Sequence, residues 1–130
     1  MSENFNLEII SPDQTIIKTE ATQVTLPSFE GLMGILKDHI PLVTFLRPGL
    51  IEVQTDKGGD KFFVEDGIVE FSNNHLLILS STAINIKNLS QNQIDKMVQD
   101  SVKIINNEDI KDKEKYILSH KLDALKEIRQ

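Results

Sequence analysis

Residues 50–65 read LIEVQTDKGGDKFFVE, two apolar segments separated by the polar link Lys57-Gly58-Gly59-Asp60. Glycines in such a link between two β-prone segments are a strong signal for a β-hairpin. The chain then repeats the pattern, because 68–72 and 75–80 are apolar segments that flank Asn73-Asn74. Asparagine tolerates the positive φ angles of a type I′ turn better than most residues. Short antiparallel strands are therefore predicted for residues 50–80.

The segments before this hairpin have the same character. Phe5, Leu7 and Ile9 alternate with polar residues, which is the period of a half-buried strand. Residues 15–26 are rich in β-branched side chains and are predicted as one strand that ends at Pro27. Turn signals recur about every eight to twelve residues, with no long helical pattern between them, so we predict a β-sandwich or barrel.

Composition and charge change near residue 88. All six Gly, all six Phe and all four Pro lie before this point, and residues 1–87 carry the whole net charge of −6. Residues 88–130 contain equal numbers of acidic and basic side chains. Such a change marks a structural boundary, so we divide the chain into a β-sandwich domain, 1–87, and a second domain, 88–130.

The second domain has the spacing of two helices. Ser90 and Gln93 match a capping box that would start the first helix. The pair Asn106-Asn107 breaks the pattern and is expected to cap a second helix, with Glu108 in its first turn. Two helices joined by a tight link form an antiparallel hairpin. The apolar positions of the two helices are Ile94, Met97, Val98, Ser101, Ile104 and Ile105, and then Ile117, Leu118, Leu122, Leu125 and Ile128.

Composition excludes several classes of function. The isoelectric point near 5.0 argues against binding to a nucleic-acid backbone, which requires a basic surface. The chain contains no cysteine, and this excludes disulfides, thiolate nucleophiles and cysteine-ligated metals. The N-terminal residues 1–4 do not resemble a signal peptide, and the apolar run 76–79 is too short to span a bilayer. We therefore expect an intracellular soluble protein.

No catalytic motif is evident in the sequence. The three histidines, His39, His75 and His120, are not at metal-ligand spacing, and nucleotide-binding glycine loops and a Gly-x-Ser-x-Gly elbow are absent. The pair Asp38-His39 could act as a base, which leaves a small hydrolase as one alternative. Neither a cofactor nor a metal is predicted.

Residues 27–48 combine turn formers with apolar pairs. Ile35 and Leu42 fit two short buried strands with a turn between them. Leu32-Met33 lies between Gly31 and Gly34, and we expect these two large apolar residues at an exposed loop tip. Exposed apolar tips usually belong to a contact surface.

Residues 5–85 contain a series of short motifs in a fixed order and spacing. They are Leu26-Pro27, Glu30-Gly31, Gly34-Ile35-Leu36, His39, Pro41-Leu42, Leu46, Pro48-Gly49, Asp66-Gly67, Val69-Glu70, His75-Leu76-Leu77-Ile78-Leu79 and Ala83. These motifs resemble the epsilon-subunit family of bacterial F-type ATP synthases, whose mitochondrial counterpart is called delta. This resemblance implies a β-sandwich of about ten strands followed by a helical hairpin.

The resemblance implies a non-catalytic subunit of the central stalk. Such a subunit couples rotation of the gamma subunit and the membrane-embedded c-ring to ATP synthesis. The resemblance also implies that the subunit lies at the cytoplasmic face of the bacterial inner membrane, as a peripheral protein held there only through the complex. Contacts to gamma are expected from Ser11, His39 and Pro41, with the Asn73-Asn74 turn far from them. Contacts to the c-ring are expected from Glu30, Gly31, Leu32 and Met33.

The resemblance also implies a role for the C-terminal helices. In many family members they extend along gamma to the catalytic alpha and beta subunits and inhibit ATP hydrolysis. Lys121, Lys126 and Arg129 are the candidate contacts here. Some family members bind ATP through a motif in the first of these helices. That motif is incomplete in this chain, because Val98-Gln99 stands where Arg-Ala is required, so we expect no ATP binding. The alternative function is a free-standing β-sandwich adaptor whose helical hairpin binds another partner.

Overall fold

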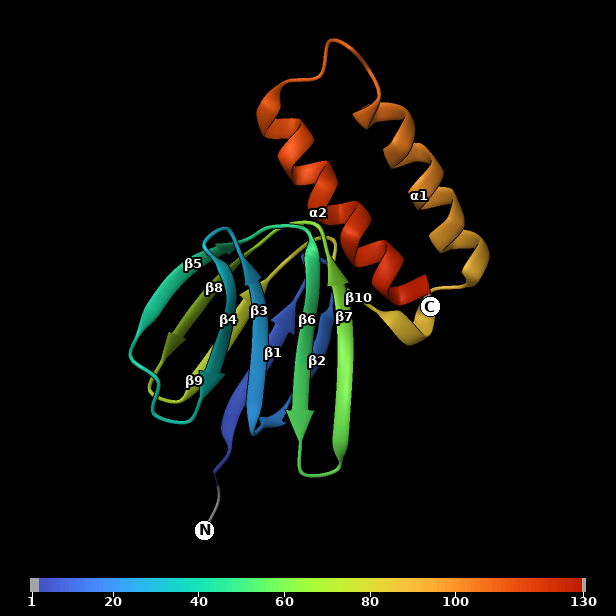
Figure 1. The fold of residues 1–130 in the computed structure, drawn as a ribbon. Coiled ribbons are helices and arrows are strands. Elements are labelled where there is room, and N and C mark those ends of the chain that lie inside the picture. Colours follow the sequence, from blue (N-terminus) through green and yellow to red (C-terminus); the bar gives the residue numbers. More distant parts are fainter. Residues whose placement is uncertain (1–2, 130) are drawn as a thin grey trace.

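The computed structural model describes residues 3–129, which fold into a β-sandwich and a helical hairpin (Figure 1). The predicted fold class is confirmed. None of the helices within residues 3–129 is long and apolar enough to cross a membrane. The strands are β1 (Phe5–Ile10), β2 (Thr15–Ala21), β3 (Gln23–Ser28), β4 (Gly31–Leu36), β5 (Leu42–Leu46), β6 (Gly49–Thr55), β7 (Gly58–Val64), β8 (Gly67–Ser72), β9 (His75–Leu79) and β10 (Ile84–Asn85). A 3-10 turn, Ile86–Asn88, precedes α1 (Gln91–Ile105) and α2 (Asp112–Arg129).

The strands form two layers joined along one side. Strands β4, β3, β6, β7 and β10 make the first layer, and β5, β8, β9, β1 and β2 make the second. The two layers meet where Ser28 of β3 pairs with Leu46 of β5. Nearly all pairings are antiparallel, and the exception is the parallel pairing of β1 with β9.

Alternation along the strands fills the space between the layers. Phe5, Leu7 and Ile9 of β1 all point inward and are buried, as predicted. Facing strands contribute further fully buried side chains, and their burial supplies the main stabilisation of the sandwich. The largest of these are Leu26, Ile35, Leu46, Ile51, Phe62, Phe71, Leu76 and Ile78.

The prediction of one strand over residues 15–26 is wrong, because the chain changes layers at Thr22. Ala21 still pairs with Phe5 in the second layer, whereas Gln23 pairs with Gln54 in the first. Both the backbone N–H and the hydroxyl of Thr22 donate to the carbonyl of Gln54, at 2.8 and 3.2 Å. The strand also does not end at Pro27. Pro27 pairs with Leu32, and β3 continues to Ser28.

The turn formers act as predicted between β8 and β9. Asn73 and Asn74 both have positive φ angles, 50° and 58°, which is the conformation of a type I′ turn. β6 and β7 are joined by a two-residue turn, Asp56-Lys57, that is tighter than the four-residue link predicted.

The first helix begins at the predicted capping box. The hydroxyl of Ser90 accepts from the N–H of Gln93 at 3.1 Å, and the Gln93 side chain accepts from the N–H of Ser90 at 2.8 Å. The second helix begins later than predicted, at Asp112. The Asn107 side chain accepts from the N–H of Asp109 at 2.9 Å, so it stabilises a turn instead of starting the helix.

The helical hairpin packs on the outer face of the first layer, with α2 between α1 and the sandwich (Figure 1). Leu50 and Phe63 are paired residues of β6 and β7 that point outward. They are buried beneath a second apolar cluster that comprises Ile94, Val98, Leu122, Ala124 and Leu125. The helical hairpin is therefore docked in this structure, and it covers the end of the first layer's outer face where Leu50 and Phe63 lie.

Candidate interaction surfaces

The outer face of the second layer carries an apolar row that the described chain leaves exposed. Phe45, Ile68, Leu79 and Ile10 are successive cross-strand neighbours on β5, β8, β9 and β1. Phe45, Ile68 and Leu79 are 58%, 46% and 44% exposed. Contiguous exposed apolar side chains of this kind mark a protein-binding surface. We call these four residues the apolar row.

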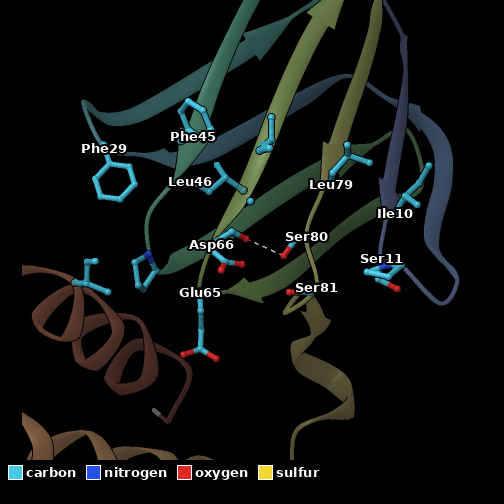
Figure 2. A pocket seen from close by; sticks show the side chains of 15 residues that line it. Ile10, Ser11, Phe29, Phe45, Leu46, Glu65, Asp66, Leu79, Ser80 and Ser81 are labelled. Atoms are coloured by element: carbon cyan, nitrogen blue, oxygen red, sulfur yellow. Dashed lines mark hydrogen bonds between the residues drawn. The ribbon is translucent and has the colours of Figure 1, made fainter. Parts of the chain in front are cut away.

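A groove of about 920 Å³ runs along this row and ends beneath helix α2. Figure 2 shows Phe29 and Phe45 along one side and Leu79 and Ile10 along the other. Ile117 of α2 contributes to the lining. The Ser80 hydroxyl, which donates to the carbonyl of Asp66 at 2.8 Å, fixes the polar end of the groove. The groove thus offers a mostly apolar depression beside the docked hairpin.

The sequence contains a signal for this row that the search for alternating apolar and polar residues does not detect. Residues 42–46, 67–71 and 75–79 place large apolar side chains on both sides of the strand, as in Leu76-Leu77-Ile78-Leu79. Strands covered on both faces have near-continuous apolar sequences. Because the hairpin covers only the first layer, the outer side chains of the second layer are left for a partner.

The residues predicted to contact gamma lie at the two ends of the second layer. Ser11 follows β1 and lines the groove next to Ile10. His39 and Pro41 lie in the connection between β4 and β5, near the turn that joins β8 to β9. Ser11 is therefore separated from His39 and Pro41 by the length of the layer, with the exposed face between them.

The expectation that the Asn73-Asn74 turn lies far from His39 is wrong. The Asn74 amide donates to the carboxylate of Asp38 at 2.9 Å and accepts from the N–H of Asp38 at 2.6 Å. Asp38 has a positive φ of 67°, which short polar side chains tolerate. The two turns are thus joined, and they hold His39 beside Phe71 with their rings edge to face at 5.9 Å.

This geometry does not favour Asp38 and His39 as a catalytic pair. The Asp38 carboxylate is bonded to Asn74, and Nδ1 of His39 is 2.7 Å from the carbonyl oxygen of Ile40. The base and its orienting carboxylate would have to bond to each other. Within residues 3–129, no three His, Asp or Glu side chains are placed to hold a metal ion.

The residues predicted to contact the c-ring lie on the β3–β4 hairpin, and one of them faces the core. Glu30 is at the exposed turn, and Leu32 points outward from β4 with 72% of its surface exposed. Met33 instead packs against the interior cluster. The expectation of an exposed tip at both residues is wrong for Met33, because β4 pairs with β3 and successive strand residues point to opposite sides.

The turn of this hairpin is built from Ser28, Phe29, Glu30 and Gly31. The fully buried Ser28 donates its hydroxyl to the carbonyl of Gly31 at 2.7 Å. Phe29 is the most prominent turn residue and was not predicted as a contact. Its ring stacks on Tyr116 of α2, with centroids 6.3 Å apart and planes at 19°.

Two of the three predicted tail contacts are engaged within the chain. Nζ of Lys121 lies 2.6 Å from a carboxylate oxygen of Glu65, which joins helix α2 to the sandwich. Arg129 is 3.6 Å from Asp95, which joins the two helices. Lys126 is exposed on the last turns of α2. Lys121 and Arg129 would therefore have to leave these partners to reach another protein.

His120 lies beside these contacts, packed edge to face on Tyr116 at 4.5 Å. Burial and the nearby Arg47 guanidinium lower the pKa of His120, and Asp123 acts in the opposite direction. The docked hairpin thus disfavours the protonated imidazole.

Comparison with known proteins agrees with the resemblance of the motifs. Residues 4–86 match the family described as ATP synthase, Delta/Epsilon chain, beta-sandwich domain. The chain is 44% identical to the ATP synthase epsilon chain of Pelagibacter ubique, over 97% of this chain and 98% of that one. It is 31% identical to the corresponding chain of Parvibaculum lavamentivorans, over 99% and 98% of the two chains.

The fold is also similar to solved structures. A chain in the mitochondrial ATP synthase of Euglena gracilis, a structure described as OSCP/F1/c-ring, superposes with a TM-score of 0.76 at 19% identity. That superposition covers 97% of this chain and 79% of the other. A chain in the central stalk/c-ring structure of the Tetrahymena thermophila enzyme gives 0.63 at 10% identity and covers 96% of both.

Proposed function

The chain belongs to the ATP synthase delta/epsilon family, and we propose that it is a non-catalytic central-stalk subunit of a proton-translocating F-type ATP synthase. It couples rotation of gamma and the c-ring to ATP synthesis. It has no cofactor of its own, and it is associated with the cytoplasmic face of the bacterial inner membrane only through the complex. The observation that carries this proposal is the uncovered apolar row of the second layer.

The apolar row supplies the apolar anchors of the gamma contact. A subunit that rotates with gamma needs a firm interface, and buried apolar anchors supply most of the energy of such interfaces. The row crosses the layer at the end where Ser11 lies, and His39 and Pro41 lie at the opposite end. Ser11 then borders the row directly, His39 and Pro41 form the far rim of the contact, and Phe45, Ile68, Leu79 and Ile10 form its apolar core.

The β3–β4 hairpin supplies the c-ring contact. Glu30 and Leu32 are exposed, and Gly31 gives the turn its shape, so these three residues can meet another protein directly. Met33 supports the strand from inside and contributes indirectly. The contact is mixed, with one carboxylate and one large aliphatic side chain.

The C-terminal helical hairpin inhibits ATP hydrolysis when it leaves the docked position and reaches the alpha and beta subunits. Lys121, Lys126 and Arg129 then bind acidic segments of these subunits. The docked position seen here ties up Lys121 and Arg129, so it corresponds to the non-inhibiting state. Two mutually exclusive partners for the same cations are what a conformational switch requires.

Identification of the proteins retained by a tagged copy tests the proposal against the adaptor alternative. We expect gamma, the c-ring and the catalytic subunits to co-purify with the wild-type chain. Ile68→Asp places a charge in the apolar row and should reduce this retention. Gln54→Asp is the control, because Gln54 is exposed on the first layer, away from the row. Retention of unrelated proteins alone would favour the adaptor.

Crosslinking from a single cysteine tests the assigned face, since the chain contains no other cysteine. We expect His39→Cys to crosslink to gamma in the assembled complex. Lys57→Cys, at the exposed β6–β7 turn of the first layer, is the control. The Asn73-Asn74 turn would not serve as a control, because Asn74 bonds to Asp38, the neighbour of His39. Crosslinking from residue 57 but not from residue 39 would refute the assigned face.

A further inference from the structure

Helix α2 contacts the β3–β4 turn, which also carries the proposed c-ring contact. The stacked rings of Phe29 and Tyr116 are half-exposed, at 45% and 44%. His120 supports Tyr116 from within the helix. The stack therefore lies at the surface, at the junction between the hairpin and the sandwich.

The turn holds its contact residues in a fixed arrangement. The bond from the Ser28 hydroxyl to the Gly31 carbonyl closes the turn, and Gly31 adopts a φ of +124°. Leu32, just beyond it, lines a hollow of about 320 Å³ together with His120 and Glu127 of α2. Helix α2 thus borders the turn both at Phe29 and at Leu32.

We propose that Tyr116 is part of the c-ring contact, so that a c-ring seated on the turn holds the hairpin docked. This inference rests on the proposed function, because it takes the c-ring as the occupant of the turn. Glu30 and Leu32 stay exposed while the hairpin is docked, so both contacts can be made at once. A protein surface that covers Phe29 and Glu30 also meets Tyr116, and it does so only in the docked state.

The linkage follows from this extra contact. A partner that touches one more side chain in one of two conformations shifts the equilibrium toward that conformation. The effect is reciprocal, so the docked hairpin strengthens c-ring binding by the same factor. Release of the hairpin toward the catalytic subunits therefore has to overcome the contact of Tyr116 with the c-ring as well as the contacts within the chain.

Distance measurement between two labelled cysteines tests the linkage. Lys57→Cys and Lys113→Cys place the labels on exposed positions of the sandwich and of α2. The docked fraction is measured in the free chain and after binding to a subcomplex of gamma and the c-ring without the catalytic subunits. We expect the ratio of docked to released hairpin to rise at least about fivefold on binding, the lower end of typical coupling between sites.

Two variants at one position identify the residue responsible. Tyr116→Ala should abolish the rise and weaken binding to the subcomplex by the same factor. Tyr116→Phe keeps the ring and should behave as the wild type. The quantity to compare is the change in docked fraction when the subcomplex binds. The docked fraction of the free chain alone would mislead, because Tyr116→Ala also removes the stack with Phe29 there.

The outcomes separate this inference from the proposed function. Failure of the wild-type chain to bind the subcomplex would refute both. Binding with an unchanged or lower docked fraction would overturn the inference alone. An equal rise in docked fraction for Tyr116→Ala and Tyr116→Phe would also overturn the inference alone.

Discussion

Gly31 carries the β3–β4 turn through a backbone conformation that side chains rarely adopt. Its φ is +124°, and a Cβ at this position would meet no atom within 4 Å. Space is therefore not the reason for glycine here. The reason is the backbone angle, which only glycine adopts without strain. The sequence motif around Gly31 located this turn, but it did not identify Phe29 beside it, whose partner Tyr116 is remote in the chain.

Gly31→Ala is expected to lower the free energy of unfolding by about 1–3 kcal/mol, the usual cost of such a backbone conformation for other residues. Gly34→Ala is the matched control, since the nearest atom to its Cβ would be Nε2 of Gln23 at 3.8 Å. The control should change stability by less than about 0.5 kcal/mol. Urea denaturation measures both, and equal losses would contradict the role of the φ angle.

His120 should make hairpin docking sensitive to acid. Burial and then Arg47 lower its pKa below 6.5 in the docked state. Well above pH 6.5 the imidazole is neutral in both docked and released hairpins, so docking is at full strength. As the pH falls through that value, the released form binds a proton that the docked form resists, and docking weakens.

The docked fraction of the labelled chain at pH 7.5 and 5.5 measures this effect. We expect less docking at the lower pH and little dependence in His120→Gln. The Lys121–Glu65 pair lies next to His120, and the His120→Gln variant keeps this pair in place, so the comparison isolates the imidazole. An identical pH dependence in His120→Gln would assign the effect to another group.

At the scale of elements, most strands and both helices could be predicted from local signals. Turn residues such as Asn73-Asn74 and the capping box at Ser90 act through neighbours in the chain, so the sequence contains them. The errors occur where long-range pairing decides. The strand break at Thr22 depends on which layer each half joins, and the inward side of Met33 depends on pairing with β3.

Adjacent residues of β4 should therefore respond in opposite ways to the same substitution. Met33→Asp places a carboxylate against the interior cluster and should cost at least about 2 kcal/mol of stability. Leu32→Asp should change stability by about 0.5 kcal/mol or less, since Leu32 is 72% exposed. Leu32→Asp should nevertheless weaken assembly with the c-ring. Unfolding of the isolated Leu32→Asp chain would show that Leu32 stabilises the fold instead.

At the scale of the whole molecule, the two outer faces of the sandwich are treated differently. The hairpin covers Leu50 and Phe63 on the first layer, while the apolar row of the second layer stays exposed. Sequence patterns identified the strands that carry both sets of apolar residues, but not which side chains point outward or which set the chain covers itself. That choice depends on tertiary contacts such as the Lys121–Glu65 ion pair, which no local pattern encodes.

This ion pair gives opposite predictions for its two members. Glu65→Gln frees Lys121 without removing its charge, so more hairpins are released and inhibition of ATP hydrolysis by the assembled enzyme should increase. Lys121→Gln breaks the same pair but removes one cation proposed to bind the catalytic subunits, so inhibition should increase less or fall. A partly exposed pair such as this one contributes about 0.5–1 kcal/mol, which corresponds to about a two- to fivefold change in the released fraction. Hydrolysis rates of enzyme reconstituted with each variant measure the difference. Equal changes in both variants would mean that Lys121 acts only in docking, and unchanged rates in both would mean that the hairpin is not the inhibitor.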